Sequence, residues 1–253
     1  MIIFAIMSSY KHDVVVPFKE SKLTKKQQVA EMFNRIAFRY DLLNHLLSGG
    51  IDISWRKKAI HELSSINPQQ ILDVATGTAD MPIMMTKYLK SQKIIGIDIS
   101  EGMLDLGKKK IDKLKLSDRI ELLIGDSESI NFPDNSFDAI TVAFGVRNFE
   151  VLEKGLGEML RVLKPNGKLV ILEFSKPKNR FFKKLCDFYF RFITPSLGKM
   201  ISNNKEAYQY LDKSVEAFPE GNDFVSILNK IGYHNCYYKP LTLGISTIYC
   251  GIK

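Results

Sequence analysis

Short apolar runs alternate with amphipathic stretches through the middle of this chain. Each run is about the length of a buried strand, and the stretches between runs carry helical patterns. One of these stretches, Gly155 to Leu163, is stopped by Pro165 and the turn at 166–167. Strands that alternate with helices imply right-handed crossovers and a parallel sheet. The pattern predicts an α/β fold, with strands in a run beginning at Ile71 and at residues 93–98, 120–126, 136–145 and 168–174.

The first apolar run ends in small residues and carries the clearest chemical signal. Asp73, Ala75, Gly77 and Ala79 alternate along it, and a helical pattern follows. Where a buried strand turns sharply into a helix, only small side chains let the backbone approach a bound nucleotide. Asp98 closes the next strand, twenty-one residues after Gly77, where its carboxylate can accept hydrogen bonds from both ribose hydroxyls. These residues predict a nucleoside-binding enzyme.

The spacing of the small residues indicates which nucleoside is bound. Dinucleotide enzymes show Gly-x-Gly-x-x-Gly, and that spacing is absent from this turn. The alternation instead matches the acid-x-Gly-x-Gly-x-Gly manner of enzymes that use S-adenosylmethionine (AdoMet), with alanine in two glycine places. Asp126 closes the third strand and is placed to bind the adenine amino group. We predict AdoMet as the cofactor and no metal, with the cofactor held by Asp73, Gly77, Thr78, Asp98, Asp126 and Ser127.

Helical and strand patterns also occur at both ends of the chain. Residues 25–47 are amphipathic and predict a helix over the cofactor cleft, inside a helical cap of residues 25–66. Residues 221–231 predict the last helix, and 234–240 with 245–252 a final pair of strands. Residues 1–24 form an N-terminal extension, whose first seven residues are too few to span a bilayer. We therefore expect 25–253 to form a single domain.

Two longer segments resemble the signatures of a known family. Residues 40–55 are similar to the first signature of the ubiquinone/menaquinone biosynthesis C-methyltransferases, and residues 161–175 to the second. The resemblance runs from about Gln28 to the C-terminus. Asp52 departs from it, because the family usually has histidine there, and this departure argues against a role for a histidine at that place. The other departures are Leu43, Ala143 and Asn166.

This resemblance implies a fold, a reaction and a substrate. The fold is the Rossmann-like class I AdoMet-dependent methyltransferase fold, with a mostly parallel seven-stranded sheet, helices on both faces and an antiparallel C-terminal strand. The reaction is C-methylation of a prenylated quinol. We expect demethylmenaquinol, because residues 75–80 look closer to the menaquinone-type variants, and a benzoquinol acceptor stays open. Two alternatives also remain: methylation of oxygen or of another acceptor, and a non-catalytic AdoMet-binding scaffold in a quinone-biosynthetic complex.

C-methylation needs a carbon nucleophile that is aligned with the methyl donor and shielded from water. A quinol is such a nucleophile, whereas a quinone ring is electron-poor. The candidate catalytic residues are Arg147 and Asn148, which follow the fourth strand, and Tyr40 and Asp41 from the cap. A guanidinium is an implausible proton acceptor, so we expect Arg147 to stabilise a developing phenolate. A structural ion pair is the alternative for Arg147. Water, Tyr40, Asp41 and His45 remain as proton acceptors.

Positive charge is concentrated in one part of the chain. Between Arg161 and Lys205 there are eleven Lys or Arg and two acids, a balance of +9, against +8 for the whole chain. Residues 176–219 predict a helical lid insertion. We expect its basic, aromatic stretch from Lys176 to Lys199 to touch an anionic membrane surface transiently. An internal lid over the active site is the alternative. Nucleic acid is not expected, since no RNA-binding module accompanies the stretch.

Cysteine usage and the N-terminus indicate a compartment. Cys186, Cys236 and Cys250 show no metal-ligand pairing and suggest reduced thiols. The apolar start lacks the cationic region of a signal peptide. We therefore expect a cytoplasmic enzyme that associates peripherally with the inner face of the membrane. The oligomeric state stays open, a homodimer included.

Overall fold

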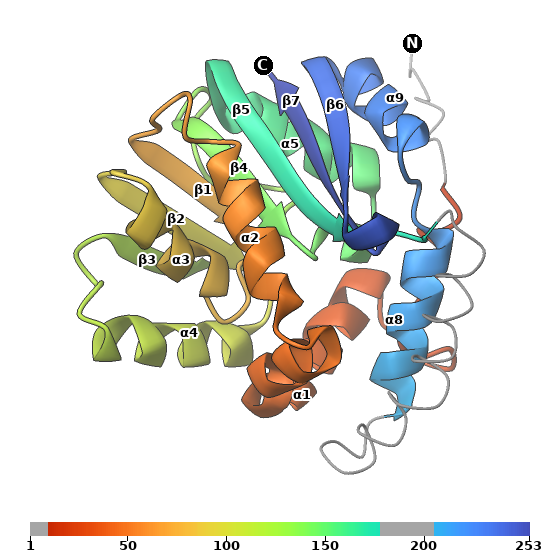
Figure 1. Cartoon of the computed structure of the whole chain (residues 1–253). Helices are drawn as coiled ribbons and strands as arrows, with labels where there is room; N and C mark the ends of the chain where they lie inside the picture. Colours follow the sequence, from red (N-terminus) through yellow and green to blue (C-terminus); the bar gives the residue numbers. More distant parts are fainter. Residues whose placement is uncertain (1–9, 178–204) are drawn as a thin grey trace.

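A computed structural model describes residues 10–177 and 205–253 (Figure 1). The strands in these residues join into one sheet, and each predicted apolar run forms a strand. The observed strands are β1 (Gln70–Val74), β2 (Lys93–Asp98), β3 (Ile120–Ile124), β4 (Phe137–Ala143), β5 (Leu163–Phe174), β6 (His234–Leu241) and β7 (Ser246–Ile252).

The sheet has the order β3-β2-β1-β4-β5-β7-β6. β1 pairs in parallel with β2 and β4, and the parallel pairing continues to β3 on one side and β5 on the other. β7 is antiparallel to both β5 and β6, so it alone of these strands runs against the others. The predicted seven-stranded, mostly parallel sheet with an antiparallel C-terminal strand is confirmed.

Helices lie on both faces of this sheet (Figure 1). Short 3₁₀ helices follow β4 and β6. The helices are α1 (Lys25–Ser48), α2 (Ile51–His61), α3 (Asp80–Tyr88), α4 (Glu101–Lys113), α5 (Leu152–Val162), α8 (Lys205–Ala217), α9 (Asn222–Ile231), and the 3₁₀ helices η1 (Val146–Asn148) and η3 (Thr242–Gly244).

The core forms two apolar layers because successive strand residues point to opposite faces of the sheet. On β1, Ile71 packs with α2, α3 and α4, while Leu72 packs with α5 and α9 on the other face. Both side chains are fully buried. This sandwich fixes the carboxyl ends of β1, β2 and β4 side by side, and α1 and α8 lie beyond these ends (Figure 1).

Two boundaries differ by three residues or more from those predicted by sequence, and others, such as the ends of β3 and β4, differ by one or two. α5 begins at Leu152, three residues before the predicted start at Gly155. β5 begins at Leu163 rather than at Lys168, because Leu163 already pairs with Phe137 before the chain turns at residue 166. Asn166 has a φ of 63°, the left-handed conformation that asparagine tolerates.

The N-terminal extension packs against the domain from residue 10 onward. The hydroxyl of Tyr10 donates to the Glu153 carboxylate at 2.6 Å, and the Lys25 ammonium donates to the carbonyl of His12 at 2.7 Å. Residues 1–9 and 178–204 lie outside the described part, which removes most of the predicted lid and basic stretch from view. In the part that is described, no helix is both long and apolar enough to cross a bilayer.

Candidate active site

The turn from β1 to α3 forms the floor of the site. Ala75, Gly77 and Ala79 all have left-handed backbones, with φ of 54°, 57° and 66°. The alternation of small residues in the sequence therefore matches an alternation of positive φ, which glycine adopts without strain and alanine at some cost. The peptide N–H of Gly77 donates to Asp98 Oδ2 at 2.8 Å, and this bond ties the turn to the end of β2.

The Asp98 carboxylate is held at the mouth of the turn. Its Oδ1 accepts from the peptide N–H of Ser100 at 2.9 Å, and its side chain is 9% exposed. Burial raises the pKa of Asp98, and the backbone hydrogen bonds from Ser100 and Gly77 oppose that rise. Each carboxylate oxygen can accept more than one hydrogen bond. Asp98 can therefore accept further donors from a bound nucleoside.

A cleft opens over this turn, with about 640 Å³ of empty space that includes its open mouth. It lies between α1 and the carboxyl ends of the strands. Phe33, Met103 and Phe149 supply part of its apolar lining. Six of the predicted site residues line it: Tyr40, Gly77, Asp98, Asp126, Ser127 and Asn148.

Lys26, at the start of α1, is a cleft residue that the sequence did not reveal. Its ammonium lies 2.6 Å from Asp126 Oδ2 and 3.2 Å from Glu128 Oε2. The Glu128 carboxylate is buried and also accepts from the peptide N–H groups of Glu150 and Val151. Nothing in the sequence around Lys26 distinguishes it from a solvated lysine. The predicted contact of Asp126 with adenine stays a prediction, and Lys26 occupies part of that carboxylate.

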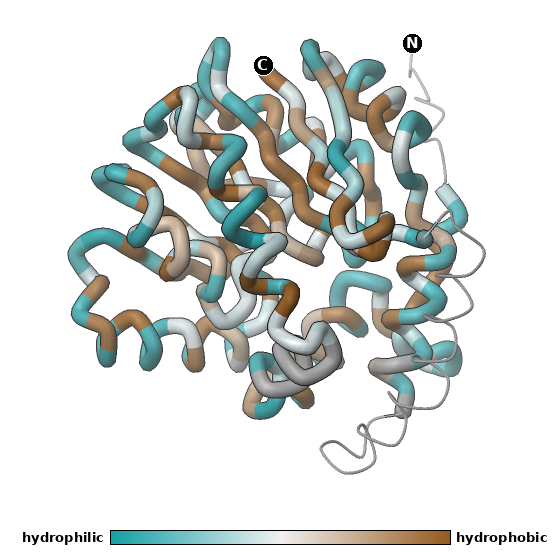
Figure 2. The backbone as a smooth tube through the Cα atoms, in the orientation of Figure 1, coloured by the Kyte–Doolittle hydropathy of each residue, from teal (hydrophilic) through white to brown (hydrophobic). Residues whose placement is uncertain are grey.

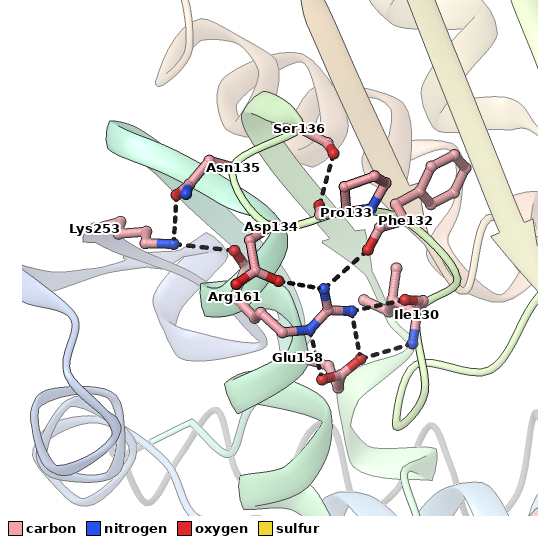
Figure 3. Close-up of polar contacts among 9 residues, drawn as sticks. All are labelled: Ile130, Phe132, Pro133, Asp134, Asn135, Ser136, Glu158, Arg161 and Lys253. Atoms are coloured by element: carbon pink, nitrogen blue, oxygen red, sulfur yellow. Dashed lines mark hydrogen bonds and ion pairs between the residues drawn. The ribbon is translucent and has the colours of Figure 1, made fainter.

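Arg161, on α5, anchors the segment 130–134 that precedes β4 (Figure 3). Its guanidinium donates to the carbonyls of Ile130 and Phe132, at 2.8 Å and 2.9 Å, and pairs with Asp134 and Glu158. These hydrogen bonds and ion pairs raise the pKa of Arg161. One α5 side chain thus holds both ends of the segment 130–134, which leads into the amino end of β4.

Asp41 and Thr78 belong to a polar latch outside the cleft lining. The Thr78 hydroxyl donates to Asp41 Oδ1, and the Lys110 ammonium lies 2.7 Å from Asp41 Oδ2 and 2.6 Å from Asp80 Oδ1. The latch joins α1 to α3 and α4. Their predicted roles in catalysis and cofactor binding stay predictions, while the contacts observed serve to hold α1 over the cleft.

Asp73 is buried beneath the turn and does not line the cleft. The hydroxyl of Thr141, on β4, donates to its Oδ1. Burial raises the pKa of Asp73 to about 7, against the effect of its hydrogen bonds. The acid of the motif therefore joins β1 to β4 from below, and its predicted contact with the cofactor stays a prediction.

Arg147 forms the ion pair that the sequence left as the alternative to a role at the phenolate. Its Nη1 lies 2.7 Å from Glu173 Oε1 and also donates to the carbonyl of Phe144. The Arg147 side chain is 7% exposed and that of Glu173 is fully buried. Because Glu173 neutralises it, Arg147 offers less positive potential to a substrate than a free guanidinium would.

A second cavity, with about 420 Å³ of empty space that includes its open mouth, lies between the end of β5, α8 and Ile245, the residue after η3. Leu211, Val215, Pro177 and Ile245 give it an apolar wall. Phe174 lines this cavity and Phe144 lines the first cleft, and the two rings stack with centroids 4.5 Å apart. A single pair of stacked rings thus stands between the two spaces.

Three residues near these rings carry buried polar atoms without partners in the part of the chain described: the Arg147 guanidinium lies over the Phe174 ring, Asn148 contacts the Phe144 carbonyl, and Tyr210 is close enough to Arg147 to feel its charge. Over the described residues, the Tyr210 hydroxyl, Arg147 Nε and Asn148 Oδ1 are buried and have no hydrogen-bond partner. Tyr210, on α8, is 3% exposed. Burial raises the pKa of Tyr210, Arg147 lowers it and Glu173 raises it, so the group stays a neutral phenol. Unpaired buried polar atoms cost free energy unless a ligand satisfies them.

Asp52 and Trp55, both on α2, have structural contacts. Asp52 is buried, accepts from the Ser48 hydroxyl at 2.6 Å and pairs with Arg56. Trp55 packs in the core, and its indole N–H donates to the Thr242 hydroxyl at 2.7 Å. The described cysteines, Cys236 and Cys250, are free thiols.

The residues of the cleft fit AdoMet. The turn is open to backbone approach, since a β-carbon on Gly77 would meet nothing nearer than Tyr40 Cε1 at 4.0 Å. Asp98 supplies acceptors for ribose hydroxyls, and the acids at 126 and 128 lie at the far end. Within the described chain, no group of three His, Cys, Asp or Glu side chains could hold a metal ion.

The order of the strands, the antiparallel β7 and the position of this cleft are together those of a class I AdoMet-dependent methyltransferase. The chain belongs to the ubiE/COQ5 methyltransferase family, whose model matches residues 21–253. Membership of this methyltransferase family, together with the fold, confirms AdoMet as the predicted methyl donor.

Individual relatives agree with this assignment. The chain is 45% identical over 245 residues to the demethylmenaquinone methyltransferase of Bacteroides fragilis, and the match covers 97% of this chain and 100% of that protein. It is 43% identical over 234 residues to the ubiquinone/menaquinone biosynthesis C-methyltransferase UbiE of Geobacter sulfurreducens, covering 92% and 91%. A solved SAM-dependent methyltransferase from Thermotoga maritima has the same fold, with a TM-score of 0.62, 16% identity and coverage of 88% and 99%.

Proposed function

We propose that this protein transfers the methyl group of AdoMet to a ring carbon of a prenylated quinol, with demethylmenaquinol as the acceptor. The observation that carries the proposal is the pair of cavities on either side of the Phe144–Phe174 stack. One cavity suits a nucleoside and the other an apolar chain. The Bacteroides relative is named for demethylmenaquinone, and this name supports the choice of ring.

The cleft residues bind AdoMet and orient it. AdoMet, when bound, supplies a methyl group already activated on a sulfonium sulfur. Asp98 accepts hydrogen bonds from the ribose hydroxyls, while Asp126 and Ser127 line the end of the cleft that receives adenine. The latch from Asp41 to Lys110 holds α1 across the cleft.

The junction of the cavities receives the quinol ring. We assign Tyr210 and Asn148 to the ring hydroxyls, because their buried polar atoms have no partner in the described chain. A neutral Tyr210 donates a hydrogen bond, which strengthens as the ring oxygen gains phenolate character. Arg147 Nε is a second donor, and Glu173 holds its guanidinium in place.

The prenyl tail accounts for the apolar second cavity and for where the enzyme works. Leu211, Val215 and Ile245 contact the first part of the tail, and the rest stays in the bilayer. The enzyme therefore has to visit the membrane, and we place it in the cytoplasm, at the inner face. The basic stretch 176–199 remains a sequence-based prediction for that contact, since most of it lies outside the described residues.

Labelled AdoMet tests the proposal with a short-tailed demethylmenaquinol as acceptor. The expected product carries the methyl group on ring carbon, located by mass spectrometry and NMR. Transfer should require dithionite, because only the reduced ring is a carbon nucleophile. Equal rates with the oxidised quinone under anaerobic, reductant-free conditions contradict the argument.

The same assay separates the alternatives. An ether product identifies an O-methyltransferase. AdoMet binding without transfer to any quinol of an extract identifies a scaffold. A benzoquinol that outcompetes the naphthoquinol reassigns the ring and leaves the reaction intact.

A further inference from the structure

Three apolar side chains stand exposed at one corner of the molecule, here called the apolar rim: Ile51, Ile53 and Leu243. Their exposed fractions are 44%, 49% and 60%. Ile51 and Ile53 begin α2 and Leu243 lies in η3, and brown stretches occur in both segments in Figure 2. The bond from Trp55 to Thr242 joins α2 to η3, so the two segments that carry these side chains are neighbours.

Leu243 is presented outward at a cost. Its backbone is left-handed, with φ of 58° and ψ of 19°, a conformation that disfavours a branched side chain. Exposed single apolar residues are common on protein surfaces. A strained backbone that directs leucine into solvent, beside two exposed isoleucines, is not explained by folding and indicates a contact that is made elsewhere.

Charge along α2 indicates what the contact is. One turn beyond Ile53, the exposed face carries Lys57 and Lys58. The acid of that segment, Asp52, is buried and paired with Arg56, so the exposed face from 51 to 61 is apolar at its tip and basic behind. Lys57 and Lys58 line a surface groove with Lys239, and Glu62, which also lines it, pairs with Lys239 at 2.7 Å, so Lys57 and Lys58 carry its net positive charge. Apolar tips with basic flanks suit the boundary between acyl chains and anionic headgroups.

The rim also adjoins the second cavity. Ile245, two residues after Leu243, lines that cavity, and the hydroxyl of Ser175 donates to the carbonyl of Gly244 at 2.8 Å. An apolar tail that leaves the cavity past η3 would meet the rim next.

We propose that the apolar rim inserts into the acyl region of an anionic membrane while Lys57 and Lys58 contact its headgroups. The surface is distinct from the basic stretch 176–199. The inference rests on the proposed function only for the nature of the tail, because membrane binding is measured without any quinol.

Vesicle sedimentation with the full chain tests the rim. The probes are vesicles of phosphatidylcholine alone and vesicles that also contain phosphatidylglycerol. We expect reversible binding to the anionic vesicles, and a loss of at least tenfold in partitioning for the triple variant Ile51→Ser, Ile53→Ser, Leu243→Ser. Leu114→Ser, at an equally exposed leucine (52%) beyond the end of α4, is the matched control and should bind as the wild type. Lys57→Gln with Lys58→Gln should reduce the preference for anionic lipid.

Leu243→Gly separates contact from folding. Glycine relieves the left-handed strain, so this variant should unfold at an equal or higher temperature and still bind vesicles more weakly. Trp55 is the sole tryptophan of the chain and lies beneath the rim. Its fluorescence should be quenched by vesicles with brominated acyl chains.

Unchanged binding of the triple variant overturns the inference, as does a bound protein whose Trp55 escapes quenching. Methyl transfer to a short-tailed quinol is scored separately. Its absence refutes the proposed function and leaves the rim result standing, whereas its survival in rim variants that no longer bind vesicles supports both.

Discussion

Ala75 and Gly145 face each other across the carboxyl ends of β1 and β4: a β-carbon built on Gly145 would lie 2.6 Å from that of Ala75. Ala75 cannot move aside as a flexible side chain could, because its β-carbon is fixed to a left-handed backbone at φ 54°. The size of residue 145 therefore controls the shape of the AdoMet turn.

Gly145→Ala should displace this turn. We expect AdoMet affinity to fall at least tenfold, about 1.4 kcal/mol, in calorimetric titration. The free energy of unfolding should fall by about 1–3 kcal/mol, as for an overpacked core. Adding Ala75→Gly should restore both, since it removes the opposing β-carbon and relieves a left-handed alanine.

The control for this experiment is Gly157→Ala on α5. A β-carbon there would meet nothing within 4 Å. This variant should gain about 0.5–1 kcal/mol of stability, because alanine suits a helix interior better than glycine. If Gly145→Ala bound AdoMet as well as this control, the turn would be more adaptable than the close approach implies.

Asp98→Asn should weaken AdoMet binding without unfolding the protein. The amide oxygen can still accept from Gly77 or Ser100, while the charge that favours ribose hydroxyls is lost. Hydrogen bonds to charged groups contribute roughly 1.5–3 kcal/mol each, so a loss of tenfold or more is expected by calorimetry. Asp105→Asn, on the exposed side of α4, should leave affinity as it is. An Asp98→Asn enzyme with wild-type affinity contradicts the ribose assignment.

Tyr210→Phe should slow methyl transfer and leave AdoMet affinity unchanged. The variant removes only a buried hydroxyl for which the described chain offers no hydrogen-bond partner. We expect kcat/KM for quinol to fall about fivefold or more, which corresponds to a loss of roughly 1 kcal/mol of transition-state stabilisation. Tyr233→Phe is the matched control, since its hydroxyl donates to the carbonyl of Leu156. The control should lower stability and spare kcat. Equal kinetics for Tyr210→Phe and the wild type remove Tyr210 from the substrate site.

Acid should weaken the packing of the N-terminal extension through His12. Burial, with Lys25 nearby, lowers the pKa of His12 to about 3, although Asp13 Oδ1 lies 3.2 Å from its Nε2. The unfolded chain binds a proton near pH 6.5, while the folded chain does not until about pH 3. Stability should therefore fall as pH drops through this window, by on the order of 1.4 kcal/mol per pH unit.

Urea unfolding at pH 5 and pH 7 measures this slope. His12→Phe, which can keep the ring contacts with Tyr10 and Phe218, should flatten it. The same change at His61, on the exposed face of α2, should leave the slope as it is. A His12→Phe slope equal to that of the wild type would assign the acid sensitivity to other groups.

Sequence alone determined the strands, most of the helices and the strand-end acids, because these follow from local periodicity and turn chemistry. The alternation of Asp73, Ala75, Gly77 and Ala79 anticipated the left-handed turn, and the position of Asp98 anticipated its place at the cleft. Local patterns suffice here because a parallel strand followed by a tight turn delivers its last residue to the same edge every time.

Only the tertiary structure decided which polar groups meet. Lys26 pairs with Asp126, one hundred residues away in the sequence, and the Tyr10 hydroxyl donates to Glu153, which is 143 residues away. No local pattern marks such partners, because α1 and the N-terminal extension are positioned by packing on the finished sheet. The partner of Arg147 was also decided by the tertiary structure. The sequence left two roles open for Arg147, stabilising a phenolate or forming an ion pair, and the register of β5 beside β4 places Glu173 next to it. Local sequence patterns therefore predict the cofactor turn, whereas long-range packing determines which polar groups pair around it.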